Sequence, residues 1–552
     1  MRNHNILGRI LVTGSLLYLV LFLIYPIGSV LGRSIDPNHF LGPLNSLVTE
    51  PYYIGRIWFT TWQAAVSTVL TLVFGLPLAY VFAKHDFWGK TLLKSVSIIP
   101  FVMPTIVVAM GFIALLGPQG VLNQVFNSLF DLDQPLIQVN NTLIIIFLAH
   151  IFYNYSIVVR IVSTVWSNLD TRYEEMTSVL GAGRVMTFIH VTLPLLMPAI
   201  GSAAILVFTF SFTSFGVVLI LGGQQFATIE VTVYELATKL FRFELAGTLA
   251  MVQLIFTYIF MFIYAKIQSK TSVQMNSIPK PTSAKKASGV KEIIIHASVF
   301  LSLIILLSPL LALIERAFSV GDSYSLLHFE NLFSNRQDSY FYHPPTQVIW
   351  NSIRFASAAM SISLLIGTTV AYFIASRNDK GSLSDSIFMM PLGISSVVMG
   401  FGFLMAFNKP YFDLRNSSLI IILAHSLVAY PFVIRSVLPV LRSIPQNMKE
   451  SARILGASDT QTFLHIDIPI IMKALLVGAV FSFAVSMGEF GASVLVTRPE
   501  FSTIPIAIYR FLSLPGTSNI GQALAMSCIL MAVVATVLMV IERFRYKESG
   551  IF

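Results

Sequence analysis

The segment Gly89-Lys90-Thr91 has the residue types that end a phosphate-binding loop, in which lysine and threonine contact the phosphates and their magnesium ion. The first glycine of such a loop would fall at position 84, which is a lysine, and no predicted strand precedes it. A phosphate cradle needs a glycine-rich backbone, so we expect no nucleotide site here. No paired carboxylates, metal-ligand cluster or nucleophile motif occurs in the predicted loops. The sequence therefore predicts no catalytic residue, no metal site and no cofactor in this chain, which is not expected to be an enzyme.

Polar side chains inside apolar segments are the next candidates for chemistry. Glu489 lies in "SMGEFGAS", and Ser214 has the matching place in "FTSFGVV". Charged groups in a membrane are costly and are often functional, so Glu489 and Ser214 could line a substrate pathway, where a carboxylate would favour a cation. The simpler alternative is a Glu489 that is hydrogen-bonded to a neighbouring helix or lies near the interface. His150 and His425 could bind a metal, although hydrogen-bonded packing is the favoured interpretation.

The composition shows which solvent surrounds these segments. Of 552 residues, 55% are hydrophobic and 11% are charged, and the mean hydropathy is +0.77. A soluble protein would carry about a quarter charged residues, so lipid must cover much of the surface. The single cysteine, Cys528, excludes an intrachain disulfide. The net charge of +9 comes mainly from short loops between apolar segments, which indicates membrane orientation rather than nucleic-acid binding.

Twelve apolar segments are long enough to cross about 30 Å of hydrocarbon as helices. Lysine and arginine gather in alternate connections between them, which predicts that both termini are cytoplasmic. We expect an all-α, multi-pass protein of the cell membrane. The segments are 8–31, 57–83, 93–116, 142–167, 195–222, 245–267, 293–315, 349–375, 384–407, 417–440, 471–496 and 520–542.

The chain contains two copies of one unit. At a constant offset of 275 residues, Leu148-Ala149-His150 matches Leu423-Ala424-His425, and Phe215-Gly216 matches Phe490-Gly491. Six spans separate each helix from its match, and this even number makes the repeats parallel, with a pathway expected on the axis between them. The predicted units are a first repeat at 1–269, a cytoplasmic linker at 270–291 and a second repeat at 292–552.

A polar loop is repeated together with the helices. "EEMTSVLGAGRVMTFIHVTLP" begins at Glu174, and "KESARILGASDTQTFLHIDIP" begins at Lys449. Each predicts a short amphipathic helix, a glycine bend, a second short helix and a proline where the next membrane helix starts. Ordinary loops diverge faster than the elements they connect. A loop retained in both copies therefore predicts a surface that contacts a paired partner.

These loops resemble the EAA loop of permease subunits in binding-protein-dependent ABC importers, with its pattern of Glu-Ala-Ala, three residues, Gly, and then Ile-x-Leu-Pro. The first copy departs from the pattern at both alanines, with Met176 and Thr177, and the second copy is closer to it. The resemblance covers nearly the whole chain and points to the fused double permeases of ferric-iron and thiamine importers. The residues that it implies for ATPase coupling are Glu175, Gly181, Ala182, Pro194, Glu450, Ala452, Gly456, Ala457 and Pro469.

The resemblance also implies partners and a substrate class. Each loop would dock into a groove on a separate ATPase, expected as a homodimer that binds the ATP, and an extracytoplasmic solute-binding protein would deliver the solute. Ferric iron is slightly favoured as the substrate, and thiamine or another small solute is the alternative. A secondary transporter with two parallel six-helix halves, and a channel or structural membrane protein, are the rival classes. No nucleic-acid partner is expected.

Overall fold

The structure is a computed structural model that describes residues 6–546 with gaps at 35–40, 88, 91–92, 94–95, 98, 171, 224, 275–284, 287–288, 322, 334–343, 377–387, 389–390, 392 and 410–411. The first half contains α1 (Ile6–Leu19), a π-helical turn (Val20–Ile24), α2 (Tyr25–Ser34), α3 (Leu41–Thr49), α4 (Pro51–Lys84), β1 (His85–Asp86), α6 (Ile99–Val102), α7 (Thr105–Leu116), α8 (Val121–Phe130), α9 (Leu143–Ser167), α10 (Arg172–Val179), α11 (Arg184–Thr187), a π-helical turn (Phe188–Thr192), α12 (Leu193–Phe212), α13 (Gly216–Leu221), α14 (Ile229–Thr238) and α15 (Phe243–Gln274).

The second half has a similar order of helices. It contains β2 (Lys285–Lys286), α16 (Val290–Phe318), β3 (Ser319–Val320), β4 (Ser323–Tyr324), α17 (Leu327–Phe333), α18 (Pro345–Ala375), α20 (Ser396–Ala406), β5 (Asn408–Lys409), β6 (Phe412–Asp413), α21 (Leu419–Ser443), α22 (Gln446–Ile454), α23 (Asp459–Thr462), a π-helical turn (Phe463–Asp467), α24 (Ile468–Met487), α25 (Ser493–Val496), a 3-10 turn (Pro499–Phe501), α26 (Ile504–Ser513) and α27 (Thr517–Tyr546). The strands form three short pairs, β1 with β2 in parallel, and β3 with β4 and β5 with β6 antiparallel.

The helices confirm an all-α membrane protein. Within the described residues, eleven helical segments are long and apolar enough to cross a membrane. The ninth predicted span, 384–407, lies partly outside the described residues, and its described helix is only α20. The linker predicted at 270–291 is helical at both ends, because α15 continues to Gln274 and α16 begins at Val290.

Two predicted spans are each divided into two helices. Segment 195–222 breaks between Phe212, where α12 ends, and Gly216, where α13 begins. Segment 471–496 breaks at the matching place, between Met487 and Ser493. Hydropathy alone could not show these breaks, because α13 and α25 are as apolar as the helices that they follow and are buried in the core.

The same three-helix packing occurs in each half. Helices α4, α9 and α12 pack together in the first half, as α18, α21 and α24 do in the second. A Cβ added to Gly75 would come within 2.8 Å of the Val158 side chain, and one added to Gly367 would come within 2.7 Å of the Val433 side chain. These glycines and valines are counterparts in the two repeats. Each glycine allows two helices to approach closely, as small residues do in membrane bundles.

The first helix of each half packs on the other half. Helix α2 contacts α20, and α16 contacts α7. The two crossings match, because a Cβ added to Gly402 would meet Pro26 at 3.1 Å and one added to Gly111 would meet the Pro309 carbonyl oxygen at 2.8 Å. The Tyr18 hydroxyl also lies 2.6 Å from the Ser426 hydroxyl, within hydrogen-bonding distance. The two halves are therefore held together by contacts that do not involve the linker.

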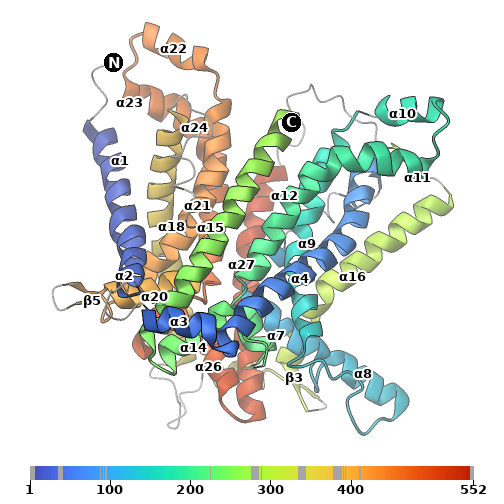
Figure 1. The fold of residues 1–552 in the computed structure, drawn as a ribbon, viewed down its shortest axis with the longest axis vertical. Coiled ribbons are helices and arrows are strands. Elements are labelled where there is room, and N and C mark those ends of the chain that lie inside the picture. Colours follow the sequence, from blue (N-terminus) through green and yellow to red (C-terminus); the bar gives the residue numbers. More distant parts are fainter. Residues whose placement is uncertain are drawn as a thin grey trace.

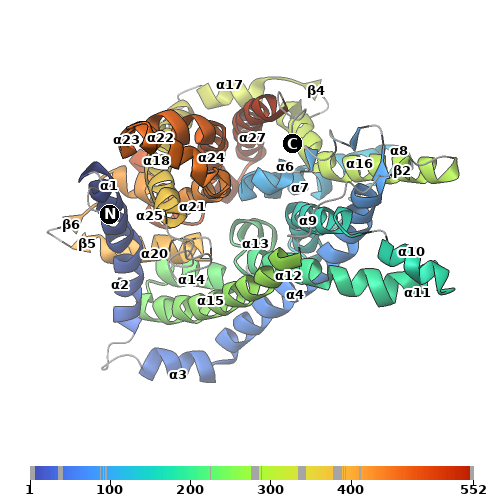
Figure 2. The same cartoon turned by 90° about the horizontal axis from the view of Figure 1, so that it is seen from above.

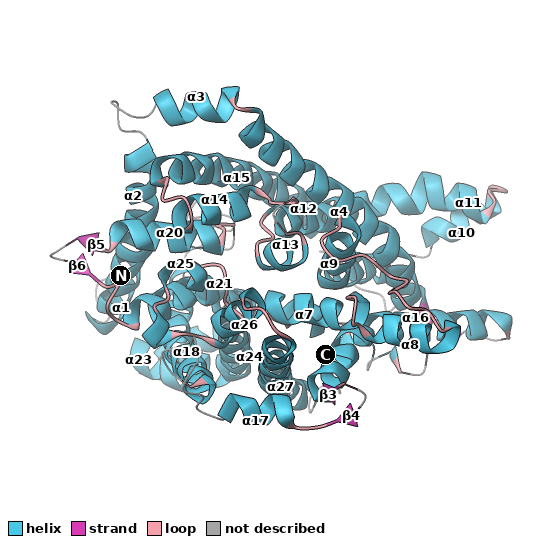
Figure 3. Ribbon diagram, turned by 90° about the horizontal axis from the view of Figure 1, so that it is seen from below, coloured by secondary structure: helices cyan, strands magenta, loops and turns pink. Residues whose placement is uncertain are grey.

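The twin polar loops lie at one end of the molecule. Figure 1 shows α10 with α11, and α22 with α23, on opposite sides of the same end, where α1 also begins. Figure 2, which views the molecule from that end, separates the two loops by the full width of the bundle. Seen from the opposite end, α13 and α26 lie near the middle of the bundle (Figure 3). The structure thus has two repeated features, an outer pair of loops and a central pair of helix breaks.

Candidate functional site

The first polar loop ends its helix α10 in a Schellman motif. The Ala182 N–H donates to the Thr177 carbonyl at 3.0 Å, and the Gly181 N–H donates to the Ser178 carbonyl at 3.1 Å. The residue that must adopt the left-handed conformation is Gly181, with φ +82°. These two bonds use carbonyls that the helix end would otherwise leave unpaired. The loop is therefore a folded turn with a defined shape.

The second loop repeats this motif bond for bond. The Ala457 N–H donates to the Ala452 carbonyl at 3.0 Å, and the Gly456 N–H donates to the Arg453 carbonyl at 3.0 Å. Gly456 has φ +87°. No heavy atom lies within 4 Å of a Cβ added to either loop glycine, so the backbone angle rather than space requires glycine at both sites.

The outer tips of both loops are apolar and exposed. Val179 and Leu180 are 87% and 84% exposed, and their counterparts Ile454 and Leu455 are 86% and 87% exposed. Glu175 and Glu450 are exposed on the same short helices. Large apolar side chains that protrude from a polar loop are candidates for contact with a protein partner or a membrane.

Each loop continues without interruption into a membrane helix. The segments Arg184–Phe212 and Thr460–Met487 are each one continuous helix, so the second short helix predicted for each loop is not a separate element. The π-helical turns join the short helices to α12 and α24 and keep the hydrogen-bonded path unbroken. Pro194 and Pro469 lie exposed in the first turns of α12 and α24.

An ion pair attaches the first loop to the membrane helices. The Lys84 ammonium at the end of α4 lies 2.9 Å from Glu174 Oε1, and the Thr192 hydroxyl donates to the same oxygen at 3.4 Å. Sequence reasoning singled out Glu175 and missed this role of Glu174. The available signal was that Lys84 and Glu174 both lie at the same predicted membrane face.

The second loop has an ion pair in which the short helix α22 supplies the positive charge. Lys449, the counterpart of Glu174, lies 2.8 Å from Asp467 Oδ1, which is fully buried. The Lys449 ammonium is also 5.7 Å from the centre of the Tyr372 ring on α18, in a cation–π contact. The positive charge lies on the loop in the second half and on a membrane helix in the first half. The two loops are therefore held by ion pairs of opposite polarity.

The central helix breaks are held by buried hydrogen bonds. Ser214, half-buried, has its hydroxyl 2.9 Å from His150 Nε2, and the Ser67 hydroxyl lies 2.8 Å from His150 Nδ1. Both ring nitrogens of His150 are therefore used in hydrogen bonds, which suits a packing role.

Glu489 binds the first turn of the short helix after its break. Its carboxylate accepts hydrogen bonds from the backbone N–H of Ala492 at 2.9 Å and of Ser493 at 3.0 Å, and from the Ser493 hydroxyl at 3.1 Å. His425 Nε2 lies 3.7 Å from Glu489 Oε2, the oxygen that accepts both bonds from Ser493. The His425 nitrogens are also 2.8 Å and 2.7 Å from the hydroxyls of Ser486 and Ser493. In this conformation both carboxylate oxygens of Glu489 accept hydrogen bonds from the protein.

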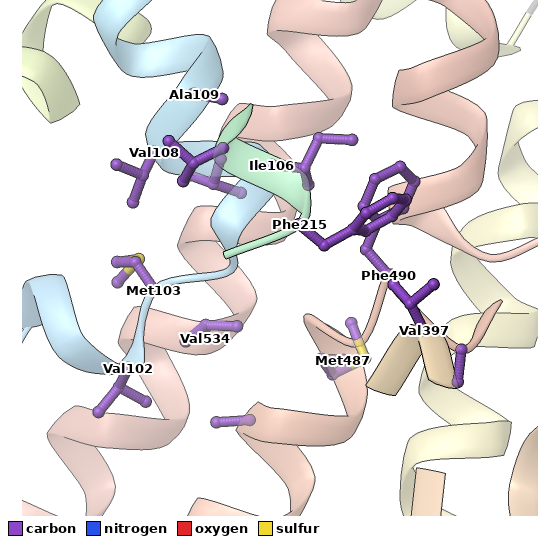
Figure 4. Packing of buried hydrophobic residues seen from close by; sticks show 14 of the residues in the cluster. Val102, Met103, Ile106, Val108, Ala109, Phe215, Val397, Met487, Phe490 and Val534 are labelled. Carbon is purple, nitrogen blue, oxygen red and sulfur yellow. The ribbon is translucent and has the colours of Figure 1, made fainter. Parts of the chain in front are cut away.

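The two breaks meet at the centre of the molecule. The Phe215 and Phe490 rings stack with their centroids 5.4 Å apart and an angle of 29° between their planes. Figure 4 shows the overlapping rings between Ile106 and Val397, which come from α7 and α20. A residue that touches its own counterpart lies on the axis that relates the copies, so this stack marks the predicted axis. Among the described residues, no group of three or more His, Cys, Asp or Glu side chains could hold a metal ion.

Comparison with known proteins agrees with this duplicated architecture. A family model described as "Binding-protein-dependent transport system inner membrane component" matches residues 72–273 and again residues 363–546. The thiamine transport system permease protein ThiP of Haemophilus influenzae is 26% identical over 84% of this chain and 84% of its own length, and ThiP of Escherichia coli is 23% identical over the same shares. The ferric transport system permease protein FbpB of Actinobacillus pleuropneumoniae is 24% identical over 96% of this chain and 78% of its own length. Because the two family matches cover more than half of the sequence, this chain belongs to the family of binding-protein-dependent transport system inner membrane components, in which it is a fused double permease.

Proposed function

We propose that this chain forms the translocation pathway of an ATP-driven importer and that a separate ATPase dimer docks on its two polar loops. The observation that carries the proposal is the pair of matched loops, each closed by the same Schellman motif and tipped by exposed apolar side chains. Two equivalent docking surfaces on opposite sides of one end suit a dimeric partner. In this arrangement both loops and both termini face the cytoplasm, and a solute-binding protein approaches the opposite end.

The coupling path follows from the continuous helices. A force on the first loop acts on the helix Arg184–Phe212, whose far end is two residues from Ser214 and three from Phe215. The helix Thr460–Met487 connects the second loop to Glu489 and Phe490 in the same way. A helix transmits an axial push because its backbone hydrogen bonds keep its length constant. Closure of the ATPase dimer would therefore move the two central breaks relative to each other.

The substrate that we favour is thiamine or a related organic cation, with ferric iron as the second candidate. The relatives named above are permeases of thiamine and of ferric transport systems. The side chains on the axis are aromatic, and aromatic faces attract organic cations. Ferric iron would favour hard oxygen ligands instead, and Glu489, which precedes Phe490, supports iron only if its bonds to Ala492 and Ser493 open.

Reconstitution tests this function directly. The chain would be placed in liposomes with the ATPase and solute-binding protein of the same transport system, and uptake of radiolabelled thiamine and of radiolabelled ferric iron would be measured with ATP, with ADP and with an ion gradient alone. ATP-dependent uptake of one solute supports the proposal. Uptake that follows an ion gradient without the ATPase would instead identify a secondary transporter.

A further inference from the structure

The stacked phenylalanines belong to a larger aromatic group on the axis. Phe215 also contacts Tyr234, with ring centroids 5.6 Å apart, and Phe490 contacts Tyr509, with centroids 5.5 Å apart. Tyr234 and Tyr509 lie close enough for their phenol groups to interact electrostatically. Each side chain of one repeat thus lies next to its counterpart in the other. We call these four residues the aromatic cluster.

The position of the aromatic cluster follows from the glycines that come after the two phenylalanines. Each phenylalanine precedes a glycine, and a Cβ added to Gly216 would come within 2.5 Å of Thr105 Oγ1 at the start of α7. A Cβ added to Gly491 would come within 2.2 Å of Ser396 Oγ at the start of α20. The glycines let each break lie against the neighbouring short helix, so that the preceding phenylalanine points to the axis. The repeated Phe-Gly pair therefore serves one geometrical purpose in both halves.

The four side chains of the aromatic cluster are largely shielded from solvent. Phe215, Phe490 and Tyr234 are 5%, 2% and 7% exposed, and Tyr509 is half-buried. Ile106 and Val397, themselves counterparts, cover the stack from either side (Figure 4). Apolar constrictions of this kind exclude water and ions from a pathway.

We propose that Phe215, Phe490, Tyr234 and Tyr509 form the gate that closes the translocation pathway, and that their ring faces contact an organic cation when the gate opens. The proposal rests on the importer function proposed above and adds the residues of the barrier and the chemistry of its lining. The gate opens when α12 and α24 separate the stacked pair, because each phenylalanine lies three residues beyond the end of one of these helices. The parted rings then offer four aromatic faces to a passing cation, and these faces stabilise positive charge without holding it tightly.

A leak assay tests the gate. The full-length chain would be reconstituted with its ATPase, but without ATP, in liposomes. These liposomes would be loaded with tetramethylammonium, a small cation that passes any open aqueous path. We expect the double variant Phe215→Ala, Phe490→Ala to release it at least tenfold faster than the wild-type chain. The variant Phe215→Leu, Phe490→Leu removes the stacked rings but keeps large apolar side chains, so it is expected to leak by several-fold and serves if the alanine variant does not fold.

The matched control is Phe208→Ala, which removes a ring packed 4.7 Å from Phe260, centroid to centroid, between α12 and α15 of one half. It is expected to retain tetramethylammonium as the wild-type chain does. Retention by both double variants, or an equal leak from the control, overturns the gate. Wild-type uptake driven by ATP, measured in the same vesicles, tests the importer function separately. A chain that imports normally while its gate variants retain the cation would contradict this inference alone.

Discussion

At the scale of single residues, the two loop glycines are fixed by backbone geometry. Gly181 and Gly456 have φ of +82° and +87° with open space around them. The left-handed conformation costs an L-residue about 1–2 kcal/mol, and more for a β-branched one. A larger side chain at either position would therefore distort the turn without any clash, and the loop would lose the rigid shape that a docked partner needs.

We expect Gly181→Val and Gly456→Val to lower ATP-driven uptake at least tenfold while ATP hydrolysis continues. The reason is that a deformed loop would absorb the movement of the ATPase. The measurement is the ratio of solute transported to ATP hydrolysed in proteoliposomes. Gly183→Val is the control, because Gly183 lies in the same loop with an ordinary φ of −68° and has no atom within 4 Å of an added Cβ. Normal coupling in both loop variants would refute the prediction.

The two loop ion pairs predict an asymmetry between the halves. Asp467 is fully buried, whereas the Glu174 side chain is 36% exposed. Removing one partner of a buried pair costs roughly 3–5 kcal/mol, and removing one partner of an exposed pair costs roughly 0–1 kcal/mol. Lys449→Met should therefore lower the Tm of the detergent-solubilised chain clearly more than Lys84→Met does. Equal changes in Tm would show that burial does not control the strength of these pairs.

At the scale of elements, the short helices α10 and α22 carry the surface proposed for the ATPase. Their tips are so exposed that the folded chain gains little from them, and this makes them unlike the buried apolar residues of the core. The continuous helices behind them connect this surface to the axial breaks. Docking and gating would thus use opposite ends of the same two helices.

Leu180→Asp together with Leu455→Asp should weaken ATPase binding at least tenfold without changing the Tm of the chain, because both side chains are more than four-fifths exposed. Binding would be measured by titrating the purified ATPase against the chain in nanodiscs. Leu129→Asp is the matched control, since Leu129 is 69% exposed and lies on α8, at the opposite end of the molecule (Figure 1). Unchanged affinity in the double variant would remove these loops as the docking surface.

At the scale of the whole molecule, the halves hold each other through their first helices. Helix α2 lies on α20, and α16 lies on α7, with a proline against a glycine at each crossing. These contacts belong to the membrane part of the protein and do not use the connection between the repeats. The architecture is therefore that of two packed subunits that are fused into one chain.

A chain cut within 275–284 by an inserted protease site should remain one particle in detergent, because the clasped helices still join the halves. Size-exclusion chromatography of the cleaved chain should give both fragments in one peak. Gly111→Leu with Gly402→Leu should then separate them, since the added side chains collide with Pro309 and Pro26. Fragments that separate without these substitutions would show that the connection itself holds the halves together.

The sequence by itself determined the membrane class, the two parallel repeats and the twin loops. Hydrophobic length, charge alternation and duplication are properties of the chain that need no knowledge of contacts, and the Gly-Ala turn of each loop is set by neighbouring residues. Only the tertiary structure decided where α12 and α24 stop, that Glu174 rather than Glu175 binds Lys84, and that the Phe215 and Phe490 rings meet. Those features depend on contacts between residues that lie 61 to 275 positions apart in the chain. Periodicity and hydropathy describe a segment's surroundings as polar or apolar, and they do not identify which distant segment supplies them.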